Sequence, residues 1–291
     1  MAAALAADEV QPLDIQNLAI NDSTFNRLLT RLALKTWGRL YKSDGFCSPI
    51  SRKKIVKTGP YVHLTEAATM RYIAENTSIP VPRVHCAFAH KGRSFIVMER
   101  IHGEEIPAAW NWLGEEGRAK IFAQLKGMIE EMRFLEPPPG TGVQSCVGGS
   151  LYDSRMNRNE TRFGPFATIQ DFHIWLRKGF RSTDRTQPSN LESSEEKQLE
   201  EMEAMQDGPW PHPVFTHADL NPSNILVRGE EVVGIIDWEF AGWYPHYWEY
   251  TSAWFGNLVR TGWQDCLSRF LETFPAEFEM EKTRNKWWGE F

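Results

Sequence analysis

The stretch from residue 215 to residue 242 reads Phe-Thr-His-Ala-Asp-Leu-Asn-Pro-Ser-Asn-Ile-Leu-Val-Arg-Gly-Glu-Glu-Val-Val-Gly-Ile-Ile-Asp-Trp-Glu-Phe-Ala-Gly. Two apolar runs, 225–227 and 232–236, flank a short polar segment that contains Gly229. A Gly-containing connection of this length between β-branched runs predicts a β-hairpin. The rest of the sequence is interpreted around this hairpin.

Three polar side chains are grouped by the predicted hairpin. Its closure brings Asn224 and Asp237 side by side at the open end, and Asp219 stands a few residues before Asn224. Carboxylate and amide oxygens suit Mg²⁺, which completes its shell with substrate phosphates and water. The remaining carboxylate can accept a proton from an attacking hydroxyl, as kinase-type phosphoryl transfer requires. Each residue alone is an ordinary turn former, but the set, with His217 before it, favours a catalytic site.

The motif from His217 to Asn224, followed by residues 236–239, resembles the catalytic core of the aminoglycoside phosphotransferase and choline kinase group of small-molecule kinases. The resemblance covers most of the chain and is greatest to the branch common in fungi. It implies an α+β, two-lobed protein-kinase-like fold. Residues 1–101 would form a small N-lobe with a reduced β-sheet, and residues 102–291 a larger, mainly helical C-lobe.

The resemblance also implies roles for individual residues. Asp219 would be the catalytic base, and Asn224 and Asp237 would bind Mg²⁺. His217 would brace the catalytic loop, and Glu239 is a candidate for the metal shell or for a hydrogen bond to substrate.

A kinase also needs a cation on the nucleotide phosphates, oriented by a carboxylate on a helix. Lys57, at the end of a strand predicted over 53–57, and Glu66, on a helix predicted over 62–76, match the positions that this branch uses. The alternative is that Lys57 is a solvated lysine at a strand end, in which case Lys54 is the fallback.

The adenine of ATP is expected at a hinge between the lobes, at residues 98–101. The resemblance implies that backbone groups around Glu99 and Ile101 bind the base edge. This assignment depends on position alone, because backbone recognition leaves no side-chain signature.

The sequence departs from the kinase pattern in one respect. Such enzymes cover the phosphates with a Gly-rich loop, because Gly lets backbone amides approach closely. Before Lys57 the sequence has no clustered Gly motif. Residues 41–50 are interpreted as an abbreviated flap that uses backbone amides near Ser48 or Ser51.

The composition argues against several classes of protein. The 291 residues carry a net charge of −6, which argues against a nucleic-acid partner. No stretch has the length of a membrane span, so no membrane partner is expected. The four Cys residues show no metal-ligand spacing, which favours reduced thiols and a cytoplasmic location. Residues 1–15 are expected to fray, and a loop over the cleft is expected between Gly148 and Gly164.

The chain holds 12 Trp, and its aromatic share is 12%. Most of these rings are expected in the core. An aromatic cluster follows Asp237, and some of its rings are expected to face an aromatic or cationic substrate; its members are Trp238, Trp243, Tyr244, Tyr247 and Trp248.

Two hypotheses therefore remain. The first is an ATP- and Mg²⁺-dependent kinase of a hydroxyl group on a small metabolite. The second is a kinase-shaped protein without phosphotransfer activity, which binds a metabolite or nucleotide or catalyses a different biosynthetic reaction. The three intact polar residues favour the first hypothesis, whereas the missing Gly-rich loop and the Trp excess favour the second. The acceptor and the oligomeric state are left open.

Overall fold

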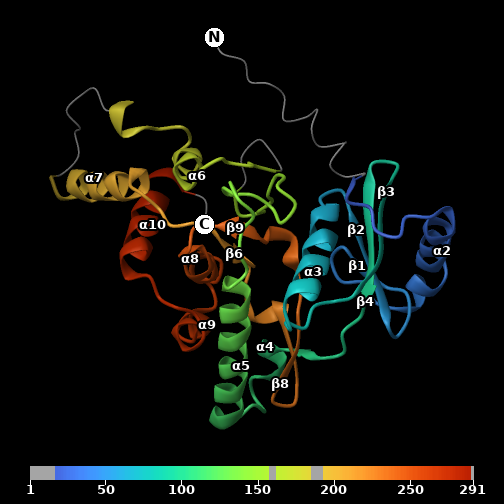
Figure 1. The fold of residues 1–291 in the computed structure, drawn as a ribbon. Coiled ribbons are helices and arrows are strands. Elements are labelled where there is room, and N and C mark those ends of the chain that lie inside the picture. The colour runs from blue at the N-terminus through green and yellow to red at the C-terminus, as the bar shows by residue number, and fades with distance from the viewer. Residues whose placement is uncertain (1–16, 157–161, 185–192, 290–291) are drawn as a thin grey trace. The chain divides into compact units, whose positions relative to one another are not determined.

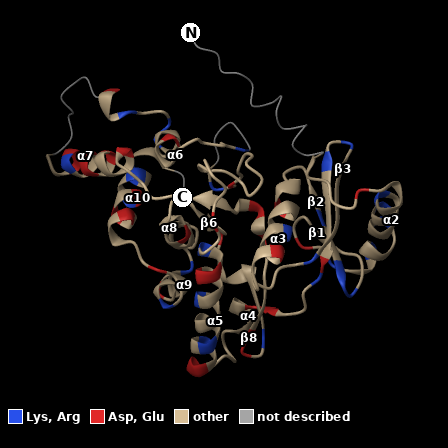
Figure 2. Ribbon diagram, viewed as in Figure 1, with Lys and Arg blue, Asp and Glu red and all other residues tan. Residues whose placement is uncertain are grey.

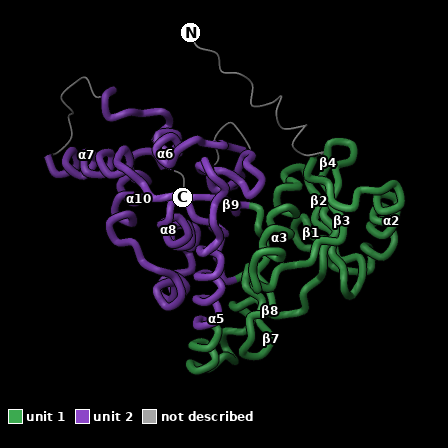
Figure 3. The backbone as a smooth tube through the Cα atoms, in the orientation of Figure 1, with its two compact units in different colours: residues 1–121, 223–239 green, residues 122–222, 240–291 purple. Residues whose placement is uncertain are grey.

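The computed structural model describes residues 17–156, 162–184 and 193–289 (Figure 1). The expected fraying of residues 1–15 falls outside these ranges, as does part of the expected loop between Gly148 and Gly164. The chain divides into two compact units (Figure 3). Unit 1 comprises residues 1–121 and 223–239, and unit 2 comprises residues 122–222 and 240–291. The lobe boundary at residue 101 stays a prediction.

Unit 1 is built on a four-stranded antiparallel sheet with the strand order β1-β2-β4-β3. The strands are β1 (Cys47–Pro49), β2 (Lys54–Gly59), β3 (Val84–His90) and β4 (Arg93–Glu99). Lys91 and Gly92 both have positive φ, 51° and 71°, which matches the tight turn between β3 and β4. One face of the sheet is closed by a small apolar core: Val56, Cys86, Phe88 and Val97.

Two helices of unit 1 begin at side-chain caps. In α2 (Thr24–Lys35) the Ser23 side chain accepts a hydrogen bond from the Asn26 backbone N–H. In α3 (Leu64–Asn76) the His63 side chain accepts from the Thr65 N–H. Such caps satisfy N–H groups that have no partner inside the helix. The remaining short helices of unit 1 are η1 (Trp37–Leu40), α4 (Ile106–Ala109) and η4 (Trp238–Phe240).

The predicted hairpin is confirmed. It consists of β7 (Ile225–Arg228) and β8 (Glu231–Ile235), which pair antiparallel with Ile225 opposite Ile235. The strand β5 (Glu104–Glu105) pairs with the other edge of β7. At the open end the Ile236 N–H donates to the Asn224 carbonyl at 2.9 Å. This bond closes the hairpin directly beside Asn224 and Asp237, and both residues line the same pocket.

Unit 2 is mainly helical. Among its described residues, β6 (Val214–Thr216) pairs with β9 (Gly242–Tyr244) in a small two-stranded sheet. Its helices are α6 (Ile169–Leu176), η2 (Ser182–Asp184), α7 (Ser193–Asp207), α8 (Trp248–Phe255), α9 (Thr261–Gln264), η5 (Leu267–Arg269) and α10 (Pro275–Trp288). The helix α5 (Glu115–Arg133) and the short η3 (Pro222–Asn224) contain the boundaries between the units. None of the helices in the described ranges is both long and apolar enough to cross a membrane.

The aromatic residues after Asp237 are core residues. Trp243, Tyr244, Tyr247 and Trp248 are each at most 1% exposed, as is Trp238 in unit 1. Tyr244 and Trp248 stack at 5.6 Å between ring centroids. The expectation that some of these rings face a substrate is therefore wrong. Their large apolar area is used for packing, which the sequence pattern cannot distinguish from a lined pocket.

Gly142 and Gly127 give a matched test of packing in unit 2. A Cβ at Gly142 would lie 2.0 Å from the Phe166 carbonyl oxygen, whereas a Cβ at Gly127 in α5 would meet nothing within 4 Å. We expect Gly142→Ala to lower the free energy of unfolding by roughly 1–3 kcal/mol, because the obstacle is backbone. Gly127→Ala should raise it by up to about 1 kcal/mol through helix propensity. Urea unfolding of both variants is the measurement, and an unchanged midpoint for Gly142→Ala would contradict the packing described.

Candidate active site

The side chain of Lys57 is the centre of a charged cluster in unit 1. Lys57 lies in β2 and is buried, with 5% of its surface exposed. Its Nζ donates hydrogen bonds to Glu66 at 3.0 Å, Glu239 at 2.9 Å and Asp237 at 2.5 Å. Three segments far apart in the sequence thus meet at one ammonium group: β2, the first turn of α3, and the chain after β8. The expected proximity of Lys57 and Glu66 is observed, whereas the fallback Lys54 is exposed.

The cluster carries more negative than positive charge. Burial alone would lower the pKa of Lys57, but the three carboxylates raise it well above its usual value, so the ammonium stays charged. Burial raises the pKa of Glu66 to about 8, against the lowering effect of Lys57. Three carboxylates around one ammonium can still bear excess negative charge, which favours a further cation nearby.

The same carboxylates form a possible metal centre. Glu66, Asp237 and Glu239 each offer an oxygen, and these oxygens lie within 4.8 Å of one another. An all-oxygen set of this kind suits Mg²⁺ better than a transition metal. Asn224 is buried and lines the same pocket as Asp237 and Glu239. The donor atoms therefore fit Mg²⁺, the metal that the sequence predicts. Glu66 offers a further carboxylate to this group, whereas the sequence predicted only that it orients Lys57.

These residues line a pocket of about 490 Å³ that belongs to unit 1. Its size lies within the range of small-ligand sites. The pocket is also lined by residues 44–47, by the strand-end residues Glu99 and Ile101, and by Leu226 of β7. Charged groups and apolar walls therefore share one cavity, as a nucleotide with a planar base and a phosphate tail requires.

The predicted hinge lies on this pocket, but part of its backbone is already used. The Glu99 N–H donates to the Arg83 carbonyl, and the Arg100 N–H donates to the Lys53 carbonyl, both at 2.9 Å. Ile101 packs over Gly234, where a Cβ would lie 2.7 Å from the Ile101 side chain. The absence of a side chain at Gly234 therefore makes room for Ile101 at the wall of the cavity.

A tight turn takes the place expected for the abbreviated flap. Asp44 and Cys47 exchange backbone hydrogen bonds of 2.9 and 2.8 Å, and Gly45 has φ of 51°. The Phe46 ring covers Gly59, where a Cβ would be 2.4 Å from the ring. Residues 44–47 line the pocket. The sequence suggested backbone amides near Ser48 or Ser51, but the residues of the flap that line the pocket are 44–47, and the Ser51 N–H donates to the Lys54 carbonyl at 3.2 Å.

The predicted catalytic loop around Asp219 lies in unit 2, and hydrogen bonds to Glu249 hold its backbone. Glu249, in α8, accepts hydrogen bonds from the backbone N–H groups of His217 at 2.7 Å and Ala218 at 3.0 Å. His217 Nδ1 accepts from the Asp219 N–H at 3.2 Å. Ala218 has φ of 65°, a strained conformation for a residue with a side chain. Glu249 therefore stabilises the bend that presents Asp219.

Arg155 is a residue of this region that the sequence analysis missed. Its guanidinium donates to both oxygens of Asp153, at 2.8 and 2.6 Å, and to the Ala218 carbonyl at 2.6 Å. Its Nη1 lies 3.8 Å from Asp219 Oδ1. Asp153 and Arg155 lie in a stretch without periodicity, so no local signal linked them to the loop. The structure places a fixed positive charge beside the predicted base.

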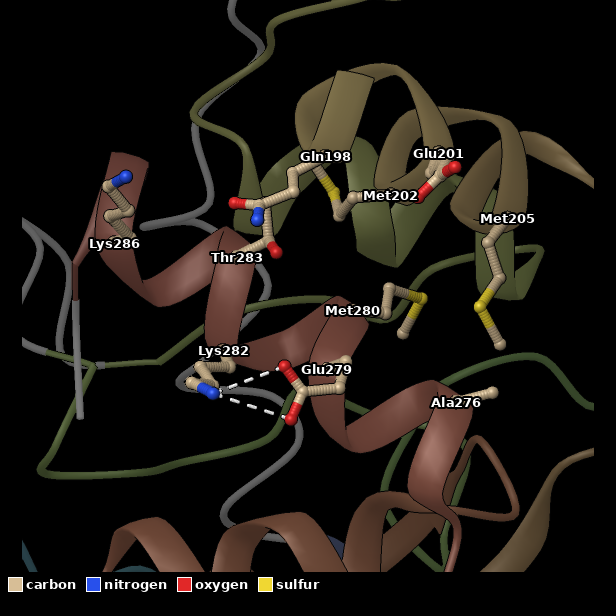
Figure 4. A pocket seen from close by; sticks show the side chains of 10 residues that line it. All are labelled: Gln198, Glu201, Met202, Met205, Ala276, Glu279, Met280, Lys282, Thr283 and Lys286. Atoms are coloured by element: carbon tan, nitrogen blue, oxygen red, sulfur yellow. Dashed lines mark hydrogen bonds and ion pairs between the residues drawn. The ribbon is translucent and has the colours of Figure 1, made fainter. Parts of the chain in front are cut away.

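A second pocket in unit 2 has a different character (Figure 4). It lies between α7 and α10 and has a volume of about 630 Å³. Met202, Met205 and Met280 line it, and its Lys282–Glu279 pair is exposed. It is larger than the pocket around Lys57, but it lacks a buried group suited to catalysis. The chemistry therefore favours the smaller pocket as the active site.

The fold and this charged cluster define a protein of the protein-kinase-like α+β class. The chain belongs to the phosphotransferase enzyme family, whose sequence profile matches residues 62–284. The match includes Glu66 and the whole segment from His217 to Glu239, whereas Lys57 and the flap precede it.

Two curated relatives are distant. The chain is 25% identical over 200 residues to clavilactone A biosynthesis cluster protein Y of Ampulloclitocybe clavipes, with 60% of this chain and 48% of the relative covered. It is 24% identical over 168 residues to homoserine kinase of Zymomonas mobilis, with 54% and 51% covered. The chain thus spans about half the length of the curated relatives it matches.

Solved structures show the same fold. Aminoglycoside phosphotransferase APH(4)-Ia matches with a TM-score of 0.57 at 14% identity, over 89% of this chain and 88% of that one. A ternary complex of a thermostable mutant of that enzyme with ADP and hygromycin B matches with a TM-score of 0.53 at 13% identity, over 87% of each chain. The predicted kinase-like fold is therefore confirmed.

The buried Glu249 predicts a pH dependence of stability. Burial raises the pKa of Glu249 from 4.5 to about 7, although the His217 and Ala218 N–H groups oppose this effect. The folded protein therefore binds more protons than the unfolded chain between these values, and its stability falls as pH rises through this window. Relative to Glu249→Gln, the wild type should lose roughly 3 kcal/mol of unfolding free energy between about pH 4.5 and pH 8.

Chemical denaturation across this pH range measures the effect. Glu200→Gln, at an exposed position of α7, is the control and should follow the wild-type profile. Parallel profiles for the wild type and Glu249→Gln would show that Glu249 is not the titrating group.

Proposed function

We propose that this protein is an ATP- and Mg²⁺-dependent phosphotransferase that acts on a hydroxyl group of a small-molecule metabolite. The observation that carries the proposal is the buried Lys57 with three carboxylates in one cavity with Asn224, in a chain of the phosphotransferase family. Lys57 and Glu66 are buried, whereas the Asp237 and Glu239 side chains are partly exposed. Burying a charged pair is costly for folding, so a cluster of this kind is expected where charge is used.

The proposed reaction transfers the γ-phosphoryl group of ATP to the acceptor hydroxyl. The acceptor hydroxyl oxygen attacks the γ-phosphorus, and its proton passes to the Asp219 carboxylate. The bond from the γ-phosphorus to its bridging oxygen breaks, and ADP leaves. Lys57 binds the phosphate oxygens, and Glu66 keeps its ammonium in position.

Asn224, Asp237 and Glu239 are the proposed ligands of Mg²⁺, which neutralises charge on the phosphate oxygens when bound. Asp237 has φ of 65°, so its backbone is strained at the place where its carboxylate enters the cluster. His217 holds the N–H of Asp219 and so fixes the start of the catalytic side chain.

The base of ATP is assigned to the hinge. Since the N–H groups of Glu99 and Arg100 are bonded within the protein, the backbone of Ile101 is the proposed contact, beside the Glu99 strand end. The apolar wall from Ile101 and Leu226 suits a planar base. The turn at residues 44–47 takes the covering role that a Gly-rich loop has in other kinases.

The acceptor is proposed as a small hydroxylated molecule, neutral or cationic, with an aromatic group as one option. The comparisons point to the reaction class only: one relative is a homoserine kinase, and one similar structure holds hygromycin B. A cytoplasmic location is proposed, since ATP is available there and none of the four cysteines, all within the described residues, forms a disulfide.

The alternative function, a kinase-shaped protein without phosphotransfer activity, is favoured by one observation. The flap has a single glycine, Gly45, and Phe46 is packed onto Gly59. A flap of this kind offers fewer close backbone contacts to phosphates than a Gly-rich loop.

Two carboxylate variants test the proposal. Asp219→Ala and Asp237→Ala should each reduce ATP turnover by at least about 10²-fold, because phosphoryl transfer depends on positioning and charge neutralisation. Asp265→Ala, at an exposed position, is the matched control. Turnover retained in either site variant would refute the assigned roles.

Thermal unfolding with Mg²⁺ and ATP separates binding from chemistry. The wild type and Asp219→Ala should both show a raised Tm, because ligand binding stabilises the folded state. Asp237→Ala should show a smaller rise, since it loses a proposed metal ligand. If the wild type shows no rise at millimolar nucleotide, the alternative function is the better one.

Arg155→Lys tests the positive charge beside Asp219. Lysine keeps the charge but cannot make the paired contacts to Asp153 together with the Ala218 contact. We expect kcat to fall by roughly tenfold, with the KM for ATP little changed, because the loop is misplaced by a small distance. Equal losses in kcat and in ATP affinity would argue against a positioning role.

A further inference from the structure

The helix α2 turns most of its large apolar side chains outward. Phe25 is 70% exposed, Leu28 66%, Leu32 55% and Leu29 45%. The residues of α2 that are buried are small, namely Thr30 and Ala33. An ordinary surface helix has the reverse arrangement, with its apolar stripe against the core.

Helical geometry shows that these four residues form one stripe. At about 100° per residue, Phe25, Leu28, Leu29 and Leu32 fall within one arc of about 100°. Thr30 and Leu34 lie on the opposite side of the helix, and Ala33 lies between the two faces. The stripe therefore faces away from the side of the helix that packs on the core of the sheet.

The orientation of α2 is fixed by several contacts. Ser23 caps its start, and Arg27 forms a two-bond pair with Asp22 at 2.6 Å. The Arg27 guanidinium also lies over the Phe88 ring, and Leu34 packs against the core of the sheet. The outward stripe thus belongs to a well-anchored helix. Two exposed side chains continue it along the chain, Trp37 at 54% and Leu40 at 78%.

The same segment is strongly basic. Residues 23–43 contain five Lys or Arg residues and no Asp or Glu, although the whole chain has a net charge of −6 (Figure 2). Arg31, Lys35, Arg39 and Lys42 are all exposed. An apolar stripe bordered by cations on an otherwise acidic protein requires a partner that is apolar and anionic together.

We propose that α2 and the residues that follow it, to Lys42, dock on the surface of an anionic lipid bilayer. A helix with an apolar stripe, a Lys/Arg border and low overall hydrophobicity lies in the plane of the membrane interface. The apolar side chains enter the acyl boundary, the cations contact the headgroups, and Trp37 is of the type enriched at this depth. No segment needs to cross the bilayer, so the binding is peripheral.

A second copy of the chain fits this surface less well. A symmetric contact places the same patch on both sides of the interface. The exposed cations of residues 23–43 would then lie on both sides of the interface, and that segment has no carboxylate to pair with them. No membrane partner is expected from the sequence, because no stretch is long enough to span a bilayer. Binding at the surface of a bilayer does not need such a stretch. The membrane proposal does not depend on the proposed function.

Vesicle flotation of the full chain tests the proposal. The probes are vesicles of phosphatidylcholine alone and vesicles of phosphatidylcholine mixed with phosphatidylglycerol. The wild type should bind the mixed vesicles, with binding that weakens as salt is added. Leu28→Gln with Leu32→Gln should weaken the partition roughly tenfold or more through lost apolar burial.

Charge and control variants complete the test. Arg31→Gln with Lys35→Gln should also weaken binding roughly tenfold or more, because each basic residue near an anionic surface contributes about fivefold. Phe134→Gln with Val259→Gln, two highly exposed apolar positions of unit 2, should bind like the wild type, and every variant should keep the wild-type Tm.

Three results would overturn the proposal. The first is no binding of the wild type to mixed vesicles, and the second is equal binding to both vesicle types. The third is a dimer in sedimentation that Leu28→Gln with Leu32→Gln dissociates, which would assign the face to a second copy.

Discussion

The shared ammonium of Lys57 is the constraint on which the rest of unit 1 depends. It lies in a strand of the sheet, and Glu66, Asp237 and Glu239 reach it from a helix and from the chain after the hairpin. Taking these groups out of water is unfavourable unless they pair closely. Each of the three carboxylates is therefore held near a fixed point, and each element that carries one must keep its register. The strand β2, the helix α3 and the hairpin β7–β8 are thus specified together.

Backbone strain accompanies the charged groups at both predicted functional acids. Ala218, directly before Asp219, and Asp237 itself each have φ of 65°. Such conformations cost about 1–3 kcal/mol each and persist only when their surroundings determine them. In unit 2 the surroundings are Glu249 and Arg155, which hold the N–H and the carbonyl of Ala218. In unit 1 they are the Lys57 contact and the end of the hairpin. Charged contacts therefore hold the backbone at both positions.

The sequence predicted those parts of the site that are encoded locally. The hairpin is readable because two β-branched runs and one glycine lie within about a dozen residues, and its closure fixes Asn224 and Asp237 whatever the rest of the chain does. Lys57 and Glu66 were assigned because kinase chemistry needs a cation oriented by a helix-borne carboxylate, and because the two residues match the positions that the resembling branch uses. Glu249 and Arg155 were not assigned, since their contacts to residues 217–219 span 31 or more positions and leave no periodic signal. Burial of the aromatic cluster was misjudged for a related reason: a Trp in a core and a Trp in a pocket have the same pattern.

The turn at residues 44–47, which lines the pocket, bears on the choice between the two functional hypotheses. Phe46 anchors it to Gly59, and the exchanged hydrogen bonds between Asp44 and Cys47 close it. A flap of this kind is short and rigid. It forms part of the cavity wall, but it offers few backbone N–H groups to a phosphate. In the proposed reaction, charge on the phosphates would be neutralised by Lys57 and by a metal that the surrounding carboxylates could hold. Lys57 and Glu66 are buried, and replacing a buried ion pair by apolar residues is often neutral or stabilising, so the proposed phosphoryl transfer would explain why the pair is kept. The retained cluster therefore counts for more than the missing glycines.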